Sequence, residues 1–165
     1  MIAAGIFAFI QYRNKNAGKI TGKVARELIK VIPKKSSAGA MGDALPVMEI
    51  EGFSCVGLLE VPSLDLKLPV GDKYQNVRIL PCQESGTPQK NDLIITGSSS
   101  NKSFTGLSRI KIGKRVTFTD LEGNRYKYKF VSAGTIRRGE EADADLVLYY
   151  PVSRNKLYVI CCEEE

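Results

Sequence analysis

The four cysteines are the strongest nucleophiles in a sequence of 165 residues that contains no histidine. They are Cys55, Cys82, Cys161 and Cys162. The lack of histidine excludes a Ser-His-Asp triad, a Cys-His dyad and a His-ligated metal. No two cysteines have C-x-x-C spacing, so neither a zinc ribbon nor a thioredoxin-like site is supported. We therefore expect no metal and no cofactor, and any acid–base chemistry must come from carboxylates, Lys, Tyr, Cys or water.

Short strands must position these residues, because most of the chain after residue 53 has strand-like patterning. Apolar and polar residues alternate, or apolar residues run together, in segments bounded by Gly, Pro or turn residues. The segments are 55–61, 64–70, 92–97, 114–120, 125–136 and 156–162. The pair 114–136 predicts a hairpin, with Tyr126, Tyr128 and Phe130 on one face of its second strand. The pattern predicts a mainly β domain over residues 47–165, a closed or incomplete β-barrel with short helices.

Positive charge is concentrated near the N-terminus. Residues 1–35 hold eight Lys or Arg and one acid, Glu27, and so carry +7. The other 130 residues hold 16 bases and 17 acids, a net charge of −1. A nearly neutral body argues against nucleic acid as a partner. A basic arm beside an apolar start instead favours an anionic membrane surface.

The first 32 residues are predicted to form a helical arm, joined to the barrel by a linker at residues 33–46. Met1–Ile10 is an unbroken apolar run that would cover roughly 15 Å as a helix, about half of a bilayer core. It is either the end of a membrane anchor or a helix that packs on its own domain. Farther along, apolar residues recur at helical spacing between bases and stop before Pro33, which predicts an amphipathic helix. Those apolar residues are Ile20, Val24, Leu28 and Val31.

The order of these segments resembles the sortases, the cysteine transpeptidases of Gram-positive cell surfaces. Four stretches carry the resemblance: GLLEVPSLDLKLPV (57–70), DLIITGS (92–98), SFTGLSRIKIGKRVTFTDLEGNRYKYKF (103–130) and KLYVICC (156–162). The family attacks a sorting-signal peptide with a Cys thiolate, uses a His as general acid and base, and holds the substrate or oxyanion with an Arg on the following strand. The resemblance implies no cofactor, a sorting-signal peptide as partner, and a place on the outer face of the cell membrane.

Carried over by position, the resemblance places Cys162 at the nucleophile position and Ser98 at the position of the family's His. A Ser hydroxyl cannot take up or release a proton near neutral pH, so it cannot replace imidazole. The strand that carries the Arg and closes the barrel is expected to be missing after Glu165. The family's calcium-binding variants use acidic loops, but residues 140–145 lack the spacing of an EF-hand and are predicted to be a solvated loop.

Three functions remain open from the sequence. The first is a catalytically impaired sortase, a cysteine transpeptidase of the kind that attaches proteins to the cell wall or pilus. The second is a true sortase altered at residue 98 and at its C-terminus. The third is a non-catalytic module that binds peptides or serves surface assembly on a sortase-like fold.

Overall fold

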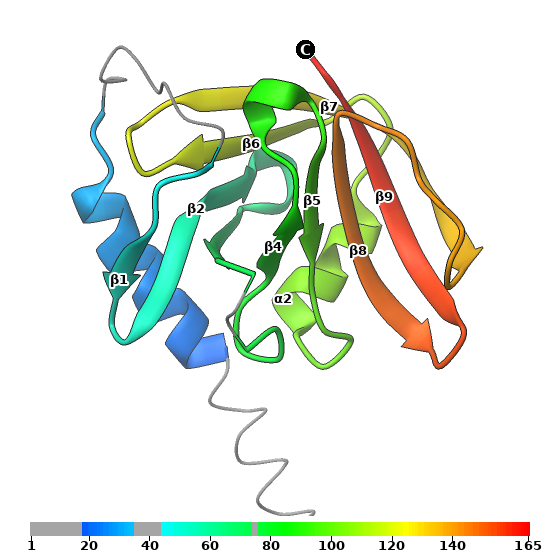
Figure 1. The fold of residues 1–165 in the computed structure, drawn as a ribbon, viewed down its shortest axis with the longest axis horizontal. Coiled ribbons are helices and arrows are strands. Elements are labelled where there is room, and N and C mark those ends of the chain that lie inside the picture. Colours follow the sequence, from blue (N-terminus) through cyan, green and yellow to red (C-terminus); the bar gives the residue numbers. More distant parts are fainter. Residues whose placement is uncertain (1–17, 35–43, 74–75) are drawn as a thin grey trace, which may run out of the picture.

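A computed structural model describes residues 18–34, 44–73 and 76–165, and most of these residues form strands (Figure 1). The strands are β1 (Met48–Ile50), β2 (Phe53–Val61), β3 (Leu66–Gly71), β4 (Cys82–Ser85), β5 (Leu93–Thr96), β6 (Arg115–Asp120), β7 (Arg125–Arg137), β8 (Leu146–Ser153) and β9 (Lys156–Glu164). The helical elements are residues 18–31, the short helix α2 (Lys102–Thr105), and 3-10 turns at Pro62–Leu64, Pro88–Lys90 and Gly106–Arg109. Met1–Ile10 lies outside the described residues.

Eight strands close into a barrel, and β1 is added to β2 as a short hairpin. The hydrogen-bonded order is β1-β2-β3-β4-β5-β8-β9-β7-β6, and β6 then pairs back to β2 from Gly57↔Asp120 to Glu60↔Thr117. The predicted mainly β barrel with short helices is therefore confirmed. The expectation that closure needs a further strand is wrong, because β9 is long enough to pair with β7 on one side and β8 on the other.

Two findings concern the individual strands. The hairpin predicted at residues 114–136 forms, with Val116 opposite Tyr128 and Phe118 opposite Tyr126. Strand β8 was not predicted, because the run LVLYYPVS follows an acidic loop and contains Pro151. The prolyl residue is tolerated near the end of β8, where the register with β9 shifts between Pro151 and Ser153.

The barrel interior is filled by the residues that point inward on each strand. In β5 and β8 these are Leu93, Ile95, Leu146 and Leu148, all with no measurable exposure. Side chains alternate along a strand, so Ile94 and Val147 lie on the outer surface of the barrel wall. The same alternation determines which residues of β5, β8 and β9 can meet a ligand outside the barrel.

The helix of residues 18–31 packs on the outside of the barrel against β1 and β2. Val24 and Leu28 are fully buried there with Cys55, Leu58 and Leu80. The helix ends before Pro33, as predicted. Val31 departs from the expected apolar face, because it is 45% exposed while the next residue, Ile32, packs against the barrel.

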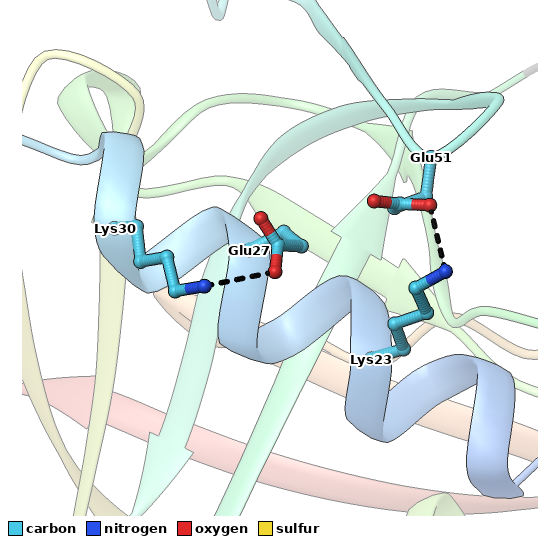
Figure 2. A network of polar contacts seen from close by, with 4 residues as sticks. All are labelled: Lys23, Glu27, Lys30 and Glu51. Atoms are coloured by element: carbon cyan, nitrogen blue, oxygen red, sulfur yellow. Dashed lines mark hydrogen bonds and ion pairs between the residues drawn. The ribbon is translucent and has the colours of Figure 1, made fainter.

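Ion pairs on the outer side of this helix accompany its packing (Figure 2). Lys23 Nζ lies 3.1 Å from a carboxylate oxygen of Glu51, and Lys30 Nζ lies 3.0 Å from Glu27. Glu51 and Gly52 both have positive φ, 51° and 82°, as a two-residue hairpin turn requires. The turn between β1 and β2 therefore carries Glu51 to the helix. Such exposed pairs contribute little to stability, so the buried side of the helix must hold it in place.

Among the residues that the structure describes, no helix is long and apolar enough to cross a membrane.

We expect Leu28→Ala to lower the free energy of unfolding by about 2–4 kcal/mol, because it opens a cavity between the helix and the barrel. The matched control is Ile29→Ala on the same helix, where the side chain is 43% exposed. The control should change the free energy by less than about 0.5 kcal/mol. Urea denaturation followed by circular dichroism measures both. Equal, small effects would contradict the packing of this helix on the barrel.

Candidate functional site

Ser98 lies where the C-terminal ends of β5 and β8 meet. The two strands are parallel, with Leu93 opposite Leu146 and Thr96 opposite Tyr149. The Gly97 N–H continues the ladder and donates to the Tyr149 carbonyl at 2.9 Å. Gly97 must lack a side chain, because a Cβ there would overlap the ring of Phe104. Continued by two residues, this register places Ser98 level with Pro151, which follows Tyr149 and Tyr150 on β8.

The hydroxyl of Ser98 belongs to a local turn. It lies 2.8 Å from the Ser100 hydroxyl and accepts a hydrogen bond from the Ser100 N–H at 3.2 Å. The Ser98 carbonyl accepts from the Asn101 N–H at 3.0 Å, and Asn101 Oδ1 caps α2 by accepting from the Phe104 N–H at 3.2 Å. These contacts order the turn that leads into α2, and none of them makes Ser98 a proton-transfer group.

Cys162 lies at the opposite end of β8. It pairs with Leu146 on β8 and with Phe130 on β7, and it is fully buried. The distance along β8 from Leu146 to Tyr149 is about 10 Å at roughly 3.3 Å per residue. The structure therefore does not bring Cys162 and Ser98 together.

The surroundings of Cys162 keep its thiol protonated. Burial, with a smaller contribution from Cys161, raises the pKa of the Cys162 thiol to about 12. The nearby Tyr128 is buried as well, and burial followed by the charge of Glu164 raises the pKa of its hydroxyl. A thiolate nucleophile needs the opposite setting, with partial exposure and a neighbouring positive charge.

The other cysteines do not form a second centre. Cys55 and Cys82 are buried, and burial raises the pKa of their thiols to about 11 and about 12. Their sulfurs donate to the carbonyls of Phe53 and Leu80. Cys161 is half-buried on the outer face of β9. Within residues 18–34, 44–73 and 76–165, no group of His, Cys, Asp or Glu could hold a metal ion.

A nucleophile that shares a proton with residue 98 would have to lie within hydrogen-bond reach of it. On the neighbouring strand β8, the residues around that level are Tyr149, Tyr150 and Pro151, and none of them is a cysteine. Burial, followed by a hydrogen bond to Glu84, raises the pKa of Tyr149 to about 12. Tyr150 stacks on Tyr158 with ring centroids 5.4 Å apart and meets Phe104 edge-on. Tyr150 is therefore an aromatic packing group, and the raised pKa of Tyr149 keeps its hydroxyl protonated at neutral pH.

The strand that follows β8 is present and begins at this same end. It is β9, which starts at Lys156 two residues after Arg154 in the turn. KLYVICC forms β9, as the sequence predicts a strand there, and β8 lies between it and β5. A single sequence contains no signal for the long-range pairing of β5 with β8.

A cleft lies on the outer surface of β5, β8 and β9, which run side by side in Figure 1. Its volume is about 460 Å³. Val147 and Val159 are buried in its floor, and the loop after β7 forms one wall. The full lining is Glu84, Ile94, Ile136, Arg138, Gly139, Glu140, Glu141, Ala142, Val147, Tyr149, Leu157 and Val159.

Charged residues border the cleft on both sides. Glu84 comes from β4, and Glu140 and Glu141 come from the loop after β7. Arg138 is the cation of the lining, and its Nε donates to the Arg154 carbonyl at 3.2 Å. The expected solvated loop thus has exposed acids, but it also forms a wall of this cleft. Sequence reasoning missed the cleft because its apolar floor comes from alternate residues of three strands.

Comparison with solved structures shows that the chain has the fold of the sortases. Sortase D5, a transpeptidase of Clostridium perfringens, matches with a TM-score of 0.61 and 10% identity, over 92% of this chain and 99% of that chain. Sortase C-3 of Streptococcus pneumoniae matches with a TM-score of 0.56 and 17% identity, over 94% and 84%. Sortase A of Listeria monocytogenes matches with a TM-score of 0.53 and 22% identity, over 67% and 87%.

Comparisons of the amino-acid sequence, unlike those of the structure, give no match. No family model matches the chain. No curated protein matches it either. At identities of 10–22%, the likeness of the structures establishes the fold, and the activity must be argued from the site.

We expect Cys162 to resist alkylation in the folded protein. With a pKa of about 12, roughly one thiol in ten thousand is ionised at pH 8, and burial blocks access to the sulfur. The test treats the variant Cys161→Ser with iodoacetamide at pH 8 and measures the C-terminal peptide by mass spectrometry. The label should appear only after unfolding in urea. Rapid labelling of the native variant at Cys162 would show an accessible, reactive thiol and contradict this description.

Proposed function

We propose that this chain is a sortase-fold protein that binds a peptide and carries out no effective transpeptidation. One observation carries the proposal: Ser98 is level with the Tyr-Tyr-Pro segment of β8 (149–151), which contains no thiol, and Cys162 is buried at the other end of that strand. The fold is retained, but no thiol shares a site with a proton-transfer group. This separation of Ser98 from Cys162 supports the impaired sortase expected from the sequence.

Thioacyl transfer needs three contributions that this arrangement does not supply together. A thiolate must attack the carbonyl, an acid must protonate the leaving amine, and a donor must hold the oxyanion. Loss of acid–base help alone costs roughly 10²–10⁴ in rate. Such groups act as a unit, so removal of any one of them already leaves activity near background. Cys162 can have no such role unless the barrel opens.

The cleft on β5, β8 and β9 supports peptide binding. It is concave, its floor is apolar, and a few polar groups border it, as in most ligand sites. Its volume of about 460 Å³ falls within the usual range for such sites. We propose a sorting-signal peptide of a surface protein as the occupant, on the analogy of the fold. A scaffold for surface assembly that uses this cleft for docking is the closest alternative.

The competing proposal is an active cysteine transpeptidase that attaches proteins to the cell wall or pilus through Cys162. It requires the β8–β9 pairing at Leu146 to open, because that pairing buries the sulfur. Seven residues of β9 (156–162) are paired on both sides, so the opening would disrupt the barrel wall. We therefore favour the binding function.

We further propose that the N-terminal arm holds the barrel at the outer face of a Gram-positive cell membrane. The support comes from the sequence of Met1–Ile10, which is wholly apolar, and from the +7 charge of residues 1–35. In the described part of the arm, the basic residues Lys19, Lys23, Arg26 and Lys30 are exposed, and Lys23 and Lys30 also pair with Glu51 and Glu27. Basic groups of this kind are attracted to anionic lipid at about 1 kcal/mol each.

We expect no cleavage of a sorting-signal peptide above background by the unmodified chain, by Cys162→Ala or by Ser98→His. The imidazole in Ser98→His would have no thiol within reach, because Cys162 lies at the other end of β8. The measurement is fluorescent peptide cleavage together with intact-mass detection of a thioacyl adduct, at pH 7.5. Turnover that disappears in Cys162→Ala would establish the transpeptidase and overturn the proposal.

A further inference from the structure

We infer that the cleft selects peptides in which a cationic side chain lies next to aliphatic ones. The inference rests on the peptide binding proposed above and names the chemistry of the occupant. No segment of the described chain fills the cleft. The lining of the cleft has two distinct parts. One part is an apolar strip along three strands, and the other consists of acids on both of its sides.

The apolar strip fits short aliphatic side chains. Val147 and Val159 are only 4% exposed and form the floor. Ile94 and Leu157 are half-buried on either side of them, on β5 and β9. Neighbouring strands lie about 4.8 Å apart, so the three strands offer a floor roughly 10 Å across. An extended peptide can lie on such a floor and bury every second side chain.

The acids come from opposite sides of this strip. The strand order β4-β5-β8-β9-β7 places Glu84 on one side and the loop that follows β7, with Glu140 and Glu141, on the other. Glu84 is exposed, and its carboxylate accepts a hydrogen bond from the Tyr149 hydroxyl. Glu140 Oε2 accepts a hydrogen bond from the Arg137 N–H at 3.2 Å, which orders the loop. Glu141 is exposed, and no hydrogen bond or ion pair engages its carboxylate within the described chain.

The single cation of the lining does not neutralise these acids. Three carboxylates and one guanidinium give the cleft a net charge of −2. Arg138 is held toward the β8–β9 turn by its bond to the Arg154 carbonyl, and its charge is felt at Tyr149. The wall formed by Glu140 and Glu141 therefore remains the negative end. A Lys or Arg of the peptide can pair with it, whereas an acidic residue is repelled.

The test compares three labelled peptides that differ at one position. The probes are fluorescein-Gly-Leu-Val-Lys-Leu-Val-Gly-amide and its versions with norleucine or Glu in place of Lys. Norleucine keeps the aliphatic stem of lysine and removes its charge. Fluorescence anisotropy with the full 165-residue chain measures the affinities. We expect the Lys probe to bind about three- to ten-fold tighter than the norleucine probe and the Glu probe to bind weakest.

Matched variants assign the effect to the cleft. The double variant Glu140→Gln, Glu141→Gln should remove the preference for Lys over norleucine, and salt should weaken the preference in the unmodified chain. The control is Asp143→Asn, which changes an exposed acid of the same loop outside the lining and should keep the preference. Leu157→Ala should lower the affinity for all three probes by a similar factor, because it removes an apolar contact in the floor of the cleft and no charge.

The outcomes separate the two proposals. Binding of the Lys and norleucine probes with equal affinity would overturn the selection of a cation and leave the peptide-binding function standing. Tightest binding of the Glu probe would overturn it as well. Absence of binding by all three probes at millimolar concentration would contradict the peptide-binding function itself. A Lys preference that survives in the double variant would show that the acids of the loop do not select the cation.

Discussion

The parallel pairing of β5 with β8, followed by the antiparallel return of β9, decides where every candidate group in this protein lies. Parallel strands bring their C-terminal ends together, so Ser98 lies by the C-terminal half of β8, just past the level of Tyr149 and Tyr150. An antiparallel return reverses the direction, so the C-terminal part of β9 lies at the start of β8, with Cys162 opposite Leu146. No side-chain movement can bridge these two ends while the barrel remains closed. The same three strands also form the floor of the cleft.

Much of the fold could be predicted from local pattern, because alternation and helical spacing are properties of short segments. The hairpin of β6 and β7 and the end of the helix before Pro33 are examples. The site could not be predicted in this way. Strand β8 contains an apolar run with a proline and is not predicted from the sequence. Without β8, the segment of β9 is interpreted as the next-to-last strand of a barrel that does not close. Which strand pairs with β5 is a long-range property, and one sequence does not encode it locally.

Burial explains the place of Cys162 in the barrel. Cys162 fills space in the core beside Phe130 and Leu146, and a protonated thiol in such a place behaves as a small apolar side chain. Gly97 and the turn at Ser98 allow Phe104 to approach the backbone closely. This packing does not depend on a histidine at residue 98. The outer surface of the barrel is shaped by a different set of residues. There, apolar residues of three strands and the loop after β7 leave a cleft that is independent of the core.

The central claim is that ligand binding takes place on the outer surface of β5, β8 and β9, away from Cys162. Backbone amide chemical-shift mapping by NMR tests it most directly, because each amide reports its own surroundings. Addition of the lysine-containing peptide should shift the amides of Ile94, Val147 and Val159 and of residues 139–142, which line the cleft. The amides of Phe130 and Cys162 should not shift. Shifts centred on Phe130 and Cys162, with the cleft unchanged, would contradict the account.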